Sequence, residues 1–492
     1  MHRSGSVRGR SPFVLAALAL GSLALAQGRA GAATPASDPT PLVPPPITVL
    51  ASKHGVDDGL IFVAPKTTPS ASVQQGPEII DDQGRVVWFH PVTNAQAANF
   101  RVQEYRGKPV ITWWEGVNAP TGPGEGIGVN FVYDQEYRQI AVVKAGNGYA
   151  ADIHEFRITP RGTAFITIYN HIPYDLSSVG GSANGTVVDA VAQEVDVATG
   201  NVVWEWHSID HVPLSESQSP PPASASAAYD YFHINAVNWD VDGNILVDSR
   251  NTWTVYKIDY RTREIIWRQG GKSSTFPVTT GDGGTQTAWQ HDPEVAGHNT
   301  LRIFDNEAAP SVLPYSRVVW VERNPFTHTS TLVKELVHPD KIQAVSQGNA
   351  QGLERGHTFV GWGATGRFSE FDAAGNLLFD ANVPSGGWDT YRAYRFEWHA
   401  RPETRPVATA TRNADGSVSV HAIWNGATDV ERWIVLTGNH AALWPSASAA
   451  WNGLDTTIAL STPAREVAVV AQAHDGRLLG RSAAVTIAAA SE

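Results

Sequence analysis

The chain has 492 residues, with 36 Lys and Arg against 48 Asp and Glu, which gives a formal net charge of −12. This acidic balance argues against a nucleic-acid-binding protein, because contacts to phosphate need a basic surface. The sequence contains no cysteine, which excludes disulfide bonds and thiolate metal sites. Any metal ion would therefore need histidine and carboxylate ligands.

The first 32 residues have the pattern of a secretory signal peptide. Three arginines precede a short apolar run at residues 13–26, and Ala-Gly-Ala at residues 30–32 ends the segment. The run is too short to span a bilayer comfortably. We therefore expect cleavage after Ala32 and a secreted protein, extracellular or periplasmic. Removing four arginines and no acids changes the net charge to 32 − 48 = −16.

After a Pro-rich linker at residues 33–46, short Val, Ile, Trp and Tyr runs are broken by Gly, Asp, Asn and Pro, a pattern typical of strands. No later segment is apolar enough to predict an integral membrane helix. One unit recurs in residues 47–402: a strand that ends in Asp, a turn, and a strand that often ends in Trp. Its copies are centred on Asp82, Asp134, Asp196, Asp259, Asn324 and Asp372, at intervals of 52, 62, 63, 65 and 48 residues. Six such hairpins predict an all-β fold, a β-propeller of six four-stranded blades.

A second set of hairpins lies between these units, and we interpret each as the two inner strands of a blade. These hairpins begin at Asn99, His154, His233, His291 and Asn349. The segments "LIFVAP" near the start and "TYRAYRFEWHA" near residue 395 are expected to complete the sixth blade. Such a closure joins the two ends of the domain and removes sheet edges.

Residues 403–492 have a different texture, with short alternating strands and the turn signals Asp415-Gly416 and Asp475-Gly476. This pattern predicts a small sandwich of the immunoglobulin or fibronectin-III type. Modules of this kind serve as spacers or binding units, and we find no catalytic set in it.

The aligned hairpins predict one site at the mouth of the propeller channel. The first residue of an inner strand lies at one mouth, and the following strand returns to that mouth. His154, His233 and His291 are therefore expected to converge from three consecutive blades. The returning strands would bring polar residues beside them, and Asn235 follows His233 by two and should face the same side. The expected substrate-binding residues are Asn170, Asn235, Asn251 and Asn306, with Arg250 as a catalytic cation.

The donors of this set suit a tetrahedral oxyanion, and a neutral imidazole is a good nucleophile. No Gly-rich phosphate loop indicates a nucleotide donor, and we expect no cofactor and no metal. Two alternatives stay open. Three histidines could bind zinc or iron in a metal-dependent lyase or oxygenase, although Arg250 would repel a cation. The protein could also be a non-catalytic secreted binding scaffold.

The segments "DIHEF", "DYFHINAVNW" followed by "LVDSRNTW", and "WQHDP" resemble the arylsulfotransferase (arylsulfate sulfotransferase) family over roughly residues 47–400. The chain is most similar to a divergent branch found in actinobacteria and fungi. The resemblance implies a six-bladed propeller that moves a sulfuryl group from a phenolic sulfate ester to a phenolic acceptor. It also implies a ping-pong mechanism through a sulfohistidine, without a nucleotide donor.

By this resemblance, His291 of "WQHD" is the nucleophile, and His154 and His233 bind sulfuryl oxygens or move protons. Asn235 of "FHIN" assists, and Arg250 of "DSRN" neutralises the charge that develops during transfer. The chain departs from enterobacterial members in one respect: those carry a disulfide near the active site, and this sequence has no cysteine. The expected partners are a small aromatic sulfate donor and a phenolic acceptor.

Overall fold

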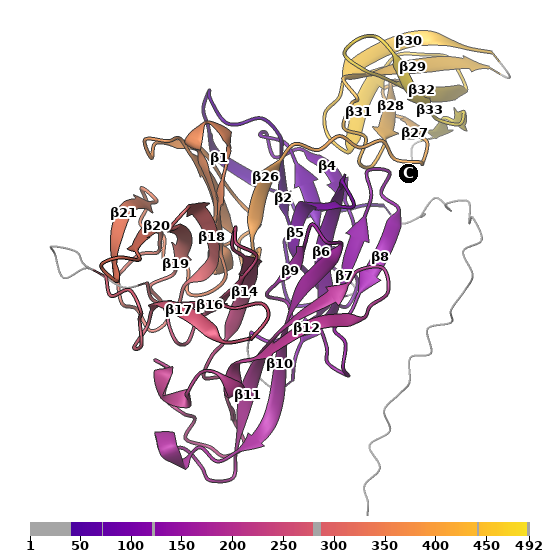
Figure 1. Ribbon diagram of the computed structural model, residues 1–492. Helices are drawn as coiled ribbons and strands as arrows, with labels where there is room; N and C mark the ends of the chain where they lie inside the picture. Colours follow the sequence, from indigo (N-terminus) through magenta and orange to yellow (C-terminus); the bar gives the residue numbers. More distant parts are fainter. Residues whose placement is uncertain (1–40, 71, 121–123, 279–286, 440–441, 490–492) are drawn as a thin grey trace, which may run out of the picture. The chain divides into compact units, whose positions relative to one another are not determined.

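The computed structural model describes residues 41–70, 72–120, 124–278, 287–439 and 442–489 (Figure 1). The predicted signal peptide and the first part of the predicted linker lie outside the described residues. Residues 42–492 belong to one unit. The all-β class is confirmed, since the helices of the described residues are single 3-10 turns. These turns are η1 (Ser177–Val179), η2 (Ser208–Asp210), η3 (Leu214–Glu216), η4 (Glu354–Gly356) and η5 (Gly363–Thr365).

In the part of the chain that the structure describes, no helix has both the length and the apolar character that a membrane crossing requires.

The described parts of residues 48–396 form six mainly antiparallel sheets, each built mainly from two consecutive hairpins. The first three, in the order of their strands, are β26 (Ala393–Phe396), β2 (Leu60–Val63), β3 (Glu78–Ile80) and β4 (Val86–Phe89); β5 (Gln96–Tyr105), β6 (Lys108–Asn118), β7 (Gly126–Tyr133) and β8 (Gln139–Val143); and β9 (Phe156–Ile158), β10 (Thr163–Tyr174), β11 (Gly185–Asp196) and β12 (Val202–His207), with β13 (Ala228–Tyr229) parallel to β11.

The other three sheets continue along the chain in the same manner. They contain β14 (Ile234–Trp239), β15 (Ile245–Ser249), β16 (Thr254–Ile258) and β17 (Ile265–Gly270); β18 (His291–Gly297), β19 (Thr300–Asp305), β20 (Arg317–Asn324) and β21 (Thr329–Val337); and β22 (Asn349–Gly352), β23 (Thr358–Gly361), β24 (Arg367–Phe371), β25 (Leu377–Asn382) and β1 (Thr48–Ser52).

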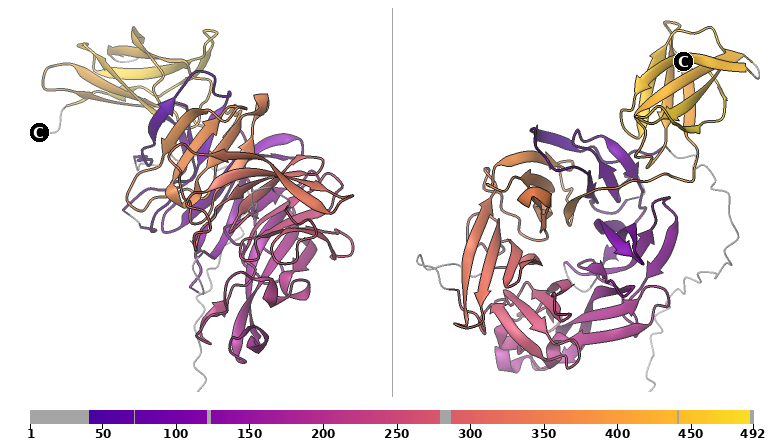
Figure 2. Two further views of the ribbon diagram at one scale, coloured as in Figure 1. Left: turned by 90° about the vertical axis from the view of Figure 1, so that its left-hand side faces the viewer. Right: turned by 45° about the horizontal axis from the view of Figure 1, so that its top comes forward.

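The six sheets follow one another around a common centre (Figure 2). Their inner strands make the contacts of a closed ring: β5 contacts β9, β10 contacts β14, β14 contacts β18, β18 contacts β22, β22 contacts β26, and β26 contacts β5. As expected, a strand from near residue 395 pairs with one from near residue 60, because β26 pairs with β2. A second closure was not expected: β1 adds a fifth strand to the outer edge of β25.

The recurring Asp has a local structural reason at each outer hairpin. Asp134 Oδ1, for example, accepts hydrogen bonds from the backbone N–H groups of Glu136 and Arg138, at 3.0 and 2.9 Å. A carboxylate or amide oxygen in this position closes the turn on its own backbone. Equivalent bonds occur at Asp196, Asp259, Asn324 and Asp372. In the first copy the turn residue is Asp81 and not the expected Asp82, because β3 ends at Ile80.

The core lies between neighbouring sheets and is rich in aromatic side chains. Trp113 and Trp114 alternate along β6, so that each packs into a different cluster of buried residues on either side of the sheet. Trp204 and Trp206 of β12 are also buried, and their indole N–H groups donate to backbone carbonyls of the next sheet. Large aromatic rings thus fill the spaces between the twisted sheets.

The last part of the chain forms two further sheets on one core that contains Val420, Trp433 and Val469. The first has the order β31 (Asp455–Leu460), β28 (Val418–Ile423), β27 (Val407–Arg412) and β35 (Ala488–Ala489). The second has the order β30 (Ala442–Ala450), β29 (Arg432–Asn439), β32 (Glu466–Gln472) and β33 (Leu478–Arg481), with β34 (Val485–Thr486) paired to β32.

Candidate active site

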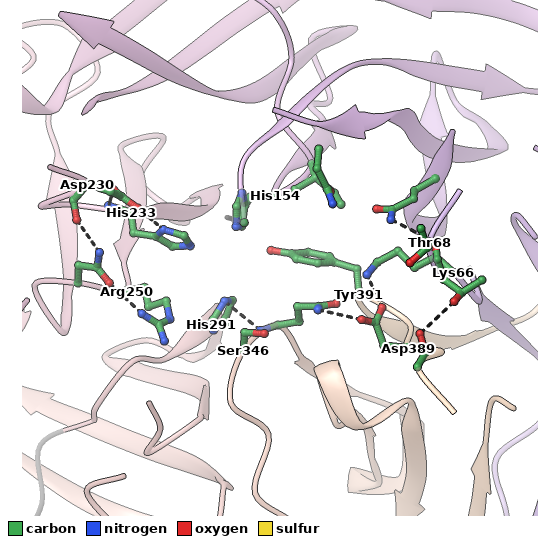
Figure 3. A pocket seen from close by; sticks show the side chains of 18 of the residues that line it. Lys66, Thr68, His154, Asp230, His233, Arg250, His291, Ser346, Asp389 and Tyr391 are labelled. Atoms are coloured by element: carbon green, nitrogen blue, oxygen red, sulfur yellow. Dashed lines mark hydrogen bonds and ion pairs between the residues drawn. The ribbon is translucent and has the colours of Figure 1, made fainter. Parts of the chain in front are cut away.

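A polar cavity of about 560 Å³ lies among residues from all six sheets or their connections, and it brings together five of the predicted residues. His154, His233, His291 and Arg250 all line it, as does Asn251. In Figure 3 the three histidines and Arg250 form one group at one end of the cavity. The rings of His154 and His233 meet edge to face, with centroids 4.9 Å apart.

His154 and His233 are each held by an aspartate that precedes them in the chain. His154 Nδ1 is bonded to Asp152 Oδ2, which also accepts the backbone N–H of His154 at 2.9 Å. His233 Nδ1 is bonded to Asp230 Oδ2, and Asp230 Oδ1 accepts the backbone N–H of His233 at 2.9 Å. Each carboxylate fixes the proton on Nδ1, which leaves Nε2 for a molecule in the cavity. Burial lowers the pKa of His233, and the Asp230 carboxylate opposes this shift.

His291 has a different partner, because its Nδ1 lies 2.7 Å from the amide oxygen of Asn306. Its Nε2 accepts the backbone N–H of Gln347 at 3.2 Å, so the ring carries its proton on Nδ1 and presents a lone pair at Nε2. The side chain is 1% exposed. Burial, followed by the positive charge of Arg250, lowers the pKa of His291 well below its usual value. His291 is therefore a neutral imidazole at physiological pH.

Arg250 follows directly after β15 and is fixed by its surroundings. Its backbone N–H donates to His233 O at 3.0 Å, its Nη1 donates to Asn251 Oδ1 at 2.9 Å, and its guanidinium lies 4.8 Å from the ring centroid of Trp289. Among the described residues, no carboxylate forms an ion pair with it within 4.0 Å, and Asp230, whose charge acts on the pKa of Arg250, is paired with His233 instead. An arginine held in this way beside three histidines favours binding of an anion in the cavity.

The other three predicted asparagines do not line the cavity. Asn306 is buried behind His291, and Asn235 is buried between strands, where its Nδ2 donates to Gln290 O at 2.8 Å. The alternation expected from His233 to Asn235 fails because His233 has a positive φ of 56° and the register shifts between Ile234 and Ala236. Asn170 lies within β10, which runs on to Tyr174, so it does not stand at a strand end.

The acidic residues beside the histidines mostly pair with buried arginines. Arg392 is fully buried, and its Nη1 lies 3.2 Å from Glu155 and 3.3 Å from Asp292. Arg157 pairs with Glu294 in the same way. Of the neighbouring acidic residues Asp152, Glu155, Asp292 and Glu294, only Asp152 bonds directly to one of the three histidines among the described residues.

Sequence reasoning missed Asp230 and Tyr391. The Asp152 and His154 pattern gave a signal for Asp230, since an aspartate precedes both histidines by two or three residues. Nothing local indicated Tyr391, which precedes β26. Its ring centroid lies 5.6 Å from that of His154, and its hydroxyl is turned toward the histidines in Figure 3. The hydroxyl is buried and has no hydrogen-bond partner among the described residues. Burial raises its pKa well above the usual value, so the phenol stays protonated.

The donor set does not suit a metal ion shared by the three histidines. Within the described residues, the group whose ligand atoms all lie within 4.8 Å of one another is Asp57, His357 and Glu370, and it contains none of the three. Arg355 pairs with Asp57, and Arg395 Nε lies 2.8 Å from Glu370. These arginines already neutralise the two carboxylates of that group.

Solved structures show only distant likenesses. The chain is similar to a protein of unknown function from Bacteroides caccae, with 12% identity over 68% of this chain and 98% of that chain and a TM-score of 0.41. A protein from Lactobacillus plantarum has 11% identity over 87% and 97%, with a TM-score of 0.37. A streptogramin B lyase has 10% identity over 77% and 88%, with a TM-score of 0.30. Such low values carry no argument about function.

No curated protein matches the chain. The family model described as Arylsulfotransferase (ASST) matches residues 101–383, which include His154, His233, Arg250 and His291. This match indicates aryl sulfotransferase activity in general terms. Because it covers more than half of the sequence, the chain belongs to the arylsulfotransferase family.

Proposed function

We propose that this protein transfers a sulfuryl group from a phenolic sulfate ester to a phenolic acceptor by a ping-pong mechanism, with His291 as the nucleophile. The observation that carries the proposal is the difference between the partners of the three histidines. The Nδ1 atoms of His154 and His233 face carboxylates, whereas that of His291 faces the neutral amide of Asn306. A carboxylate partner stabilises an imidazolium and suits proton transfer, whereas an amide partner keeps the ring neutral and suits nucleophilic attack.

In the first half-reaction, the backbone N–H of Gln347 releases the lone pair of His291 Nε2, which forms a bond to sulfur while the bond between sulfur and the aryl oxygen breaks. The aryl oxygen leaves with the bonding electrons and takes the Nε2 proton of His154 or His233. The donating ring enters this step as an imidazolium, with its Nδ1 proton bonded to the aspartate and a second proton on Nε2. The sulfated ring keeps its proton on Nδ1, and this N–H donates a hydrogen bond to Asn306 Oδ1. Arg250 stabilises the negative charge on the sulfuryl oxygens during transfer.

In the second half-reaction, the acceptor phenol enters the same cavity. The His154 or His233 that gave up its proton removes the phenolic proton, and the phenol oxygen attacks sulfur. The bond between sulfur and His291 Nε2 then breaks, which returns His291 to its neutral form. No nucleotide takes part. The cavity residues, the donor ester and the acceptor phenol supply the protons and electron pairs of each step.

The rest of the chain is proposed to support this site. We propose that the six sheets of residues 47–402 are the blades of a six-bladed β-propeller and that residues 403–492 are an immunoglobulin- or fibronectin-III-like spacer. We also propose that residues 1–32 are a signal peptide and that the protein is secreted. Mass analysis of protein recovered outside the cytoplasm should then give a chain that begins at Ala33.

A single-turnover experiment tests the chemistry. Protein without residues 1–32 is mixed with a stoichiometric amount of p-nitrophenyl sulfate, and phenol release is followed together with intact mass. The expected result is a burst of one phenol per chain and a mass increase of one sulfuryl group. Both should be lost in His291→Ala and kept in His421→Ala, which removes a histidine that pairs with Asp455 in the C-terminal sheets. A folded wild-type protein that gives no burst with several aryl sulfates would refute the proposal and favour a binding scaffold.

A further inference from the structure

The cavity has a second end, which the proposed sulfuryl chemistry does not use. Lys66, Thr68 and Asp389 lie there, on the far side of Tyr391 from the histidines (Figure 3). Lys66 and Asp389 lie outside residues 101–383, the part of the chain that the family model matches. The family match therefore does not itself assign a role to these two residues.

Lys66 and Asp389 form a rigid pair. The backbone N–H of each donates to the carbonyl of the other, at 2.9 and 3.0 Å, and Lys66 Nζ is bonded to Asp389 Oδ1. Lys66 is 7% exposed although it is a lysine. A buried ammonium held by one carboxylate oxygen retains further N–H groups for a ligand, because it has three donors.

Gln347 links this pair to the nucleophile. Its backbone N–H donates to His291 Nε2 at 3.2 Å, and its side-chain Nε2 lies 3.4 Å from Asp389 Oδ2. Its Oε1 is buried and has no hydrogen-bond partner among the described residues. A buried acceptor without a donor is costly, and a ligand that donates to it would remove that cost.

These groups select the chemistry of what binds. A carboxylate would meet Asp389, an ammonium would meet Lys66, and an apolar group would leave both the amide oxygen and the ammonium protons unpaired. A hydroxyl group can accept from Lys66 and donate to Gln347 Oε1 at the same time. Tyr391 lies between the two ends of the cavity. An aromatic acceptor bound beside it would reach from one end to the other.

On the basis of the proposed function, we propose that Lys66, Asp389 and Gln347 form a subsite for a second hydroxyl group, so that the preferred acceptors are polyhydroxylated aromatics. One phenolic oxygen would face His291, while a distant hydroxyl would be held between Lys66 and Gln347. Simple phenols would react less well because they leave this end unpaired.

The test compares two acceptors that differ in one hydroxyl: para-phenylphenol and para,para-biphenol. After the burst with p-nitrophenyl sulfate, kcat/KM is measured for each acceptor. In the wild type, kcat/KM should be about tenfold higher for biphenol than for phenylphenol, after correction for the statistical advantage of two equivalent hydroxyls. One well-made hydrogen bond allows a difference of this size. An exposed-site variant, Lys341→Met, should keep this preference. A wild-type ratio no larger than the statistical value would overturn the subsite.

Two variants assign the preference to the subsite. Gln347→Met removes the amide oxygen, and the double variant Lys66→Met with Asp389→Asn removes both charges together, so that neither remains unpaired. In each, the biphenol preference should fall to the statistical value, and an unchanged preference would contradict the proposal. If only one of the two variants folds, that one decides.

The subsite can be separated from the sulfuryl chemistry. If the wild type gives no burst, the proposed function fails, and calorimetric titration with the two phenols then tests the subsite alone. Tighter binding of biphenol that is lost in Gln347→Met would support the subsite without catalysis. Equal affinities for the two phenols would refute it.

Discussion

The amide oxygen of Asn306 lies 2.7 Å from Nδ1 of His291, and the amide cannot turn over. Its Nδ2 donates to the carbonyl oxygens of Ala344 and Gln347, both at 2.9 Å. The oxygen is therefore fixed toward the ring, and His291 must keep its proton on Nδ1. This contact sets the direction of the reactive lone pair, although Asn306 itself does not line the cavity.

The partner of His291 predicts the pH dependence of the first half-reaction. Because the pKa of His291 is lowered, the ring stays neutral even at pH values below 6.5, the usual pKa of histidine. In the wild type the acid limb of the burst rate with p-nitrophenyl sulfate should therefore lie below pH 6.5. Asn306→Asp places a carboxylate beside Nδ1, which raises the pKa of His291 and moves the acid limb to higher pH. At about pH 6 the burst should be about tenfold slower than in the wild type.

The exposed turn variant Asn201→Asp should keep the wild-type profile, because it lies far from His291 in the fold. Identical pH profiles for wild type and Asn306→Asp would show that Asn306 does not control the protonation of His291.

The position of Arg250 predicts a loss of transition-state stabilisation when its charge is removed. Arg250→Met should slow the burst by about 100- to 1,000-fold, the usual effect of removing one oxyanion donor. Arg250→Lys keeps the positive charge but not the planar guanidinium, so its burst rate should lie between those of the wild type and Arg250→Met. The measurement is the single-turnover rate, with Arg261→Met at an exposed turn as the control. A burst rate in Arg250→Met within about twofold of the wild type would remove Arg250 from the mechanism.

The unpartnered hydroxyl of Tyr391 predicts a change in activity without a loss of stability. Tyr391→Phe removes a buried group that has no partner in the described part of the protein, so the melting temperature should not fall. If the hydroxyl contacts the phenolic substrates, the acceptor kcat/KM should decrease by about fivefold.

Tyr231→Phe is the matched control for Tyr391→Phe. Tyr231 is also fully buried, and its hydroxyl makes no hydrogen bond of normal geometry to the described residues, although Ser208 lies near it. It does not line the cavity. It should change neither stability nor kinetics. Equal kinetic effects of the two substitutions would contradict a substrate contact at Tyr391.

The buried carboxyl group of Asp248 in β15 should make the stability of the protein depend on pH. Burial raises its pKa from 3.8 to about 8. The folded protein therefore binds a proton that the unfolded chain releases above about pH 4, so this contribution to stability is lost as the pH rises toward 8. Asp248→Asn imitates the neutral, protonated group, and its amide oxygen can still accept from Gln290 Nε2.

Thermal unfolding of wild type and Asp248→Asn at about pH 5 and pH 8 checks this linkage. The variant should gain relative to the wild type as the pH rises, by roughly 2 °C or more at pH 8. A difference in melting temperature that is the same at both pH values would mean that Asp248 is ionised in the folded protein.

Local features of the sequence determined the strands, the turns and the family. The Asp-centred turns depend on hydrogen bonds between a side chain and backbone groups two to four residues later, so a short sequence pattern is enough to predict them. The motifs around His154, His233 and His291 were likewise readable, because each is a few residues long. In the first outer hairpin the turn residue is Asp81, whereas the sequence pattern indicated Asp82, so such a pattern locates a turn to within one residue.

Only the tertiary structure decided which groups surround each histidine. Asn306 reaches His291 across a strand pair, and Gln347 reaches it from the next sheet, 56 residues further along the chain. A positive φ at His233 and a register shift turned Asn235 away from the cavity, which no alternation rule could foresee. The residues of the motifs were set by the sequence, but their partners depend on closure of the ring, because contacts between sheets join residues that no local pattern connects.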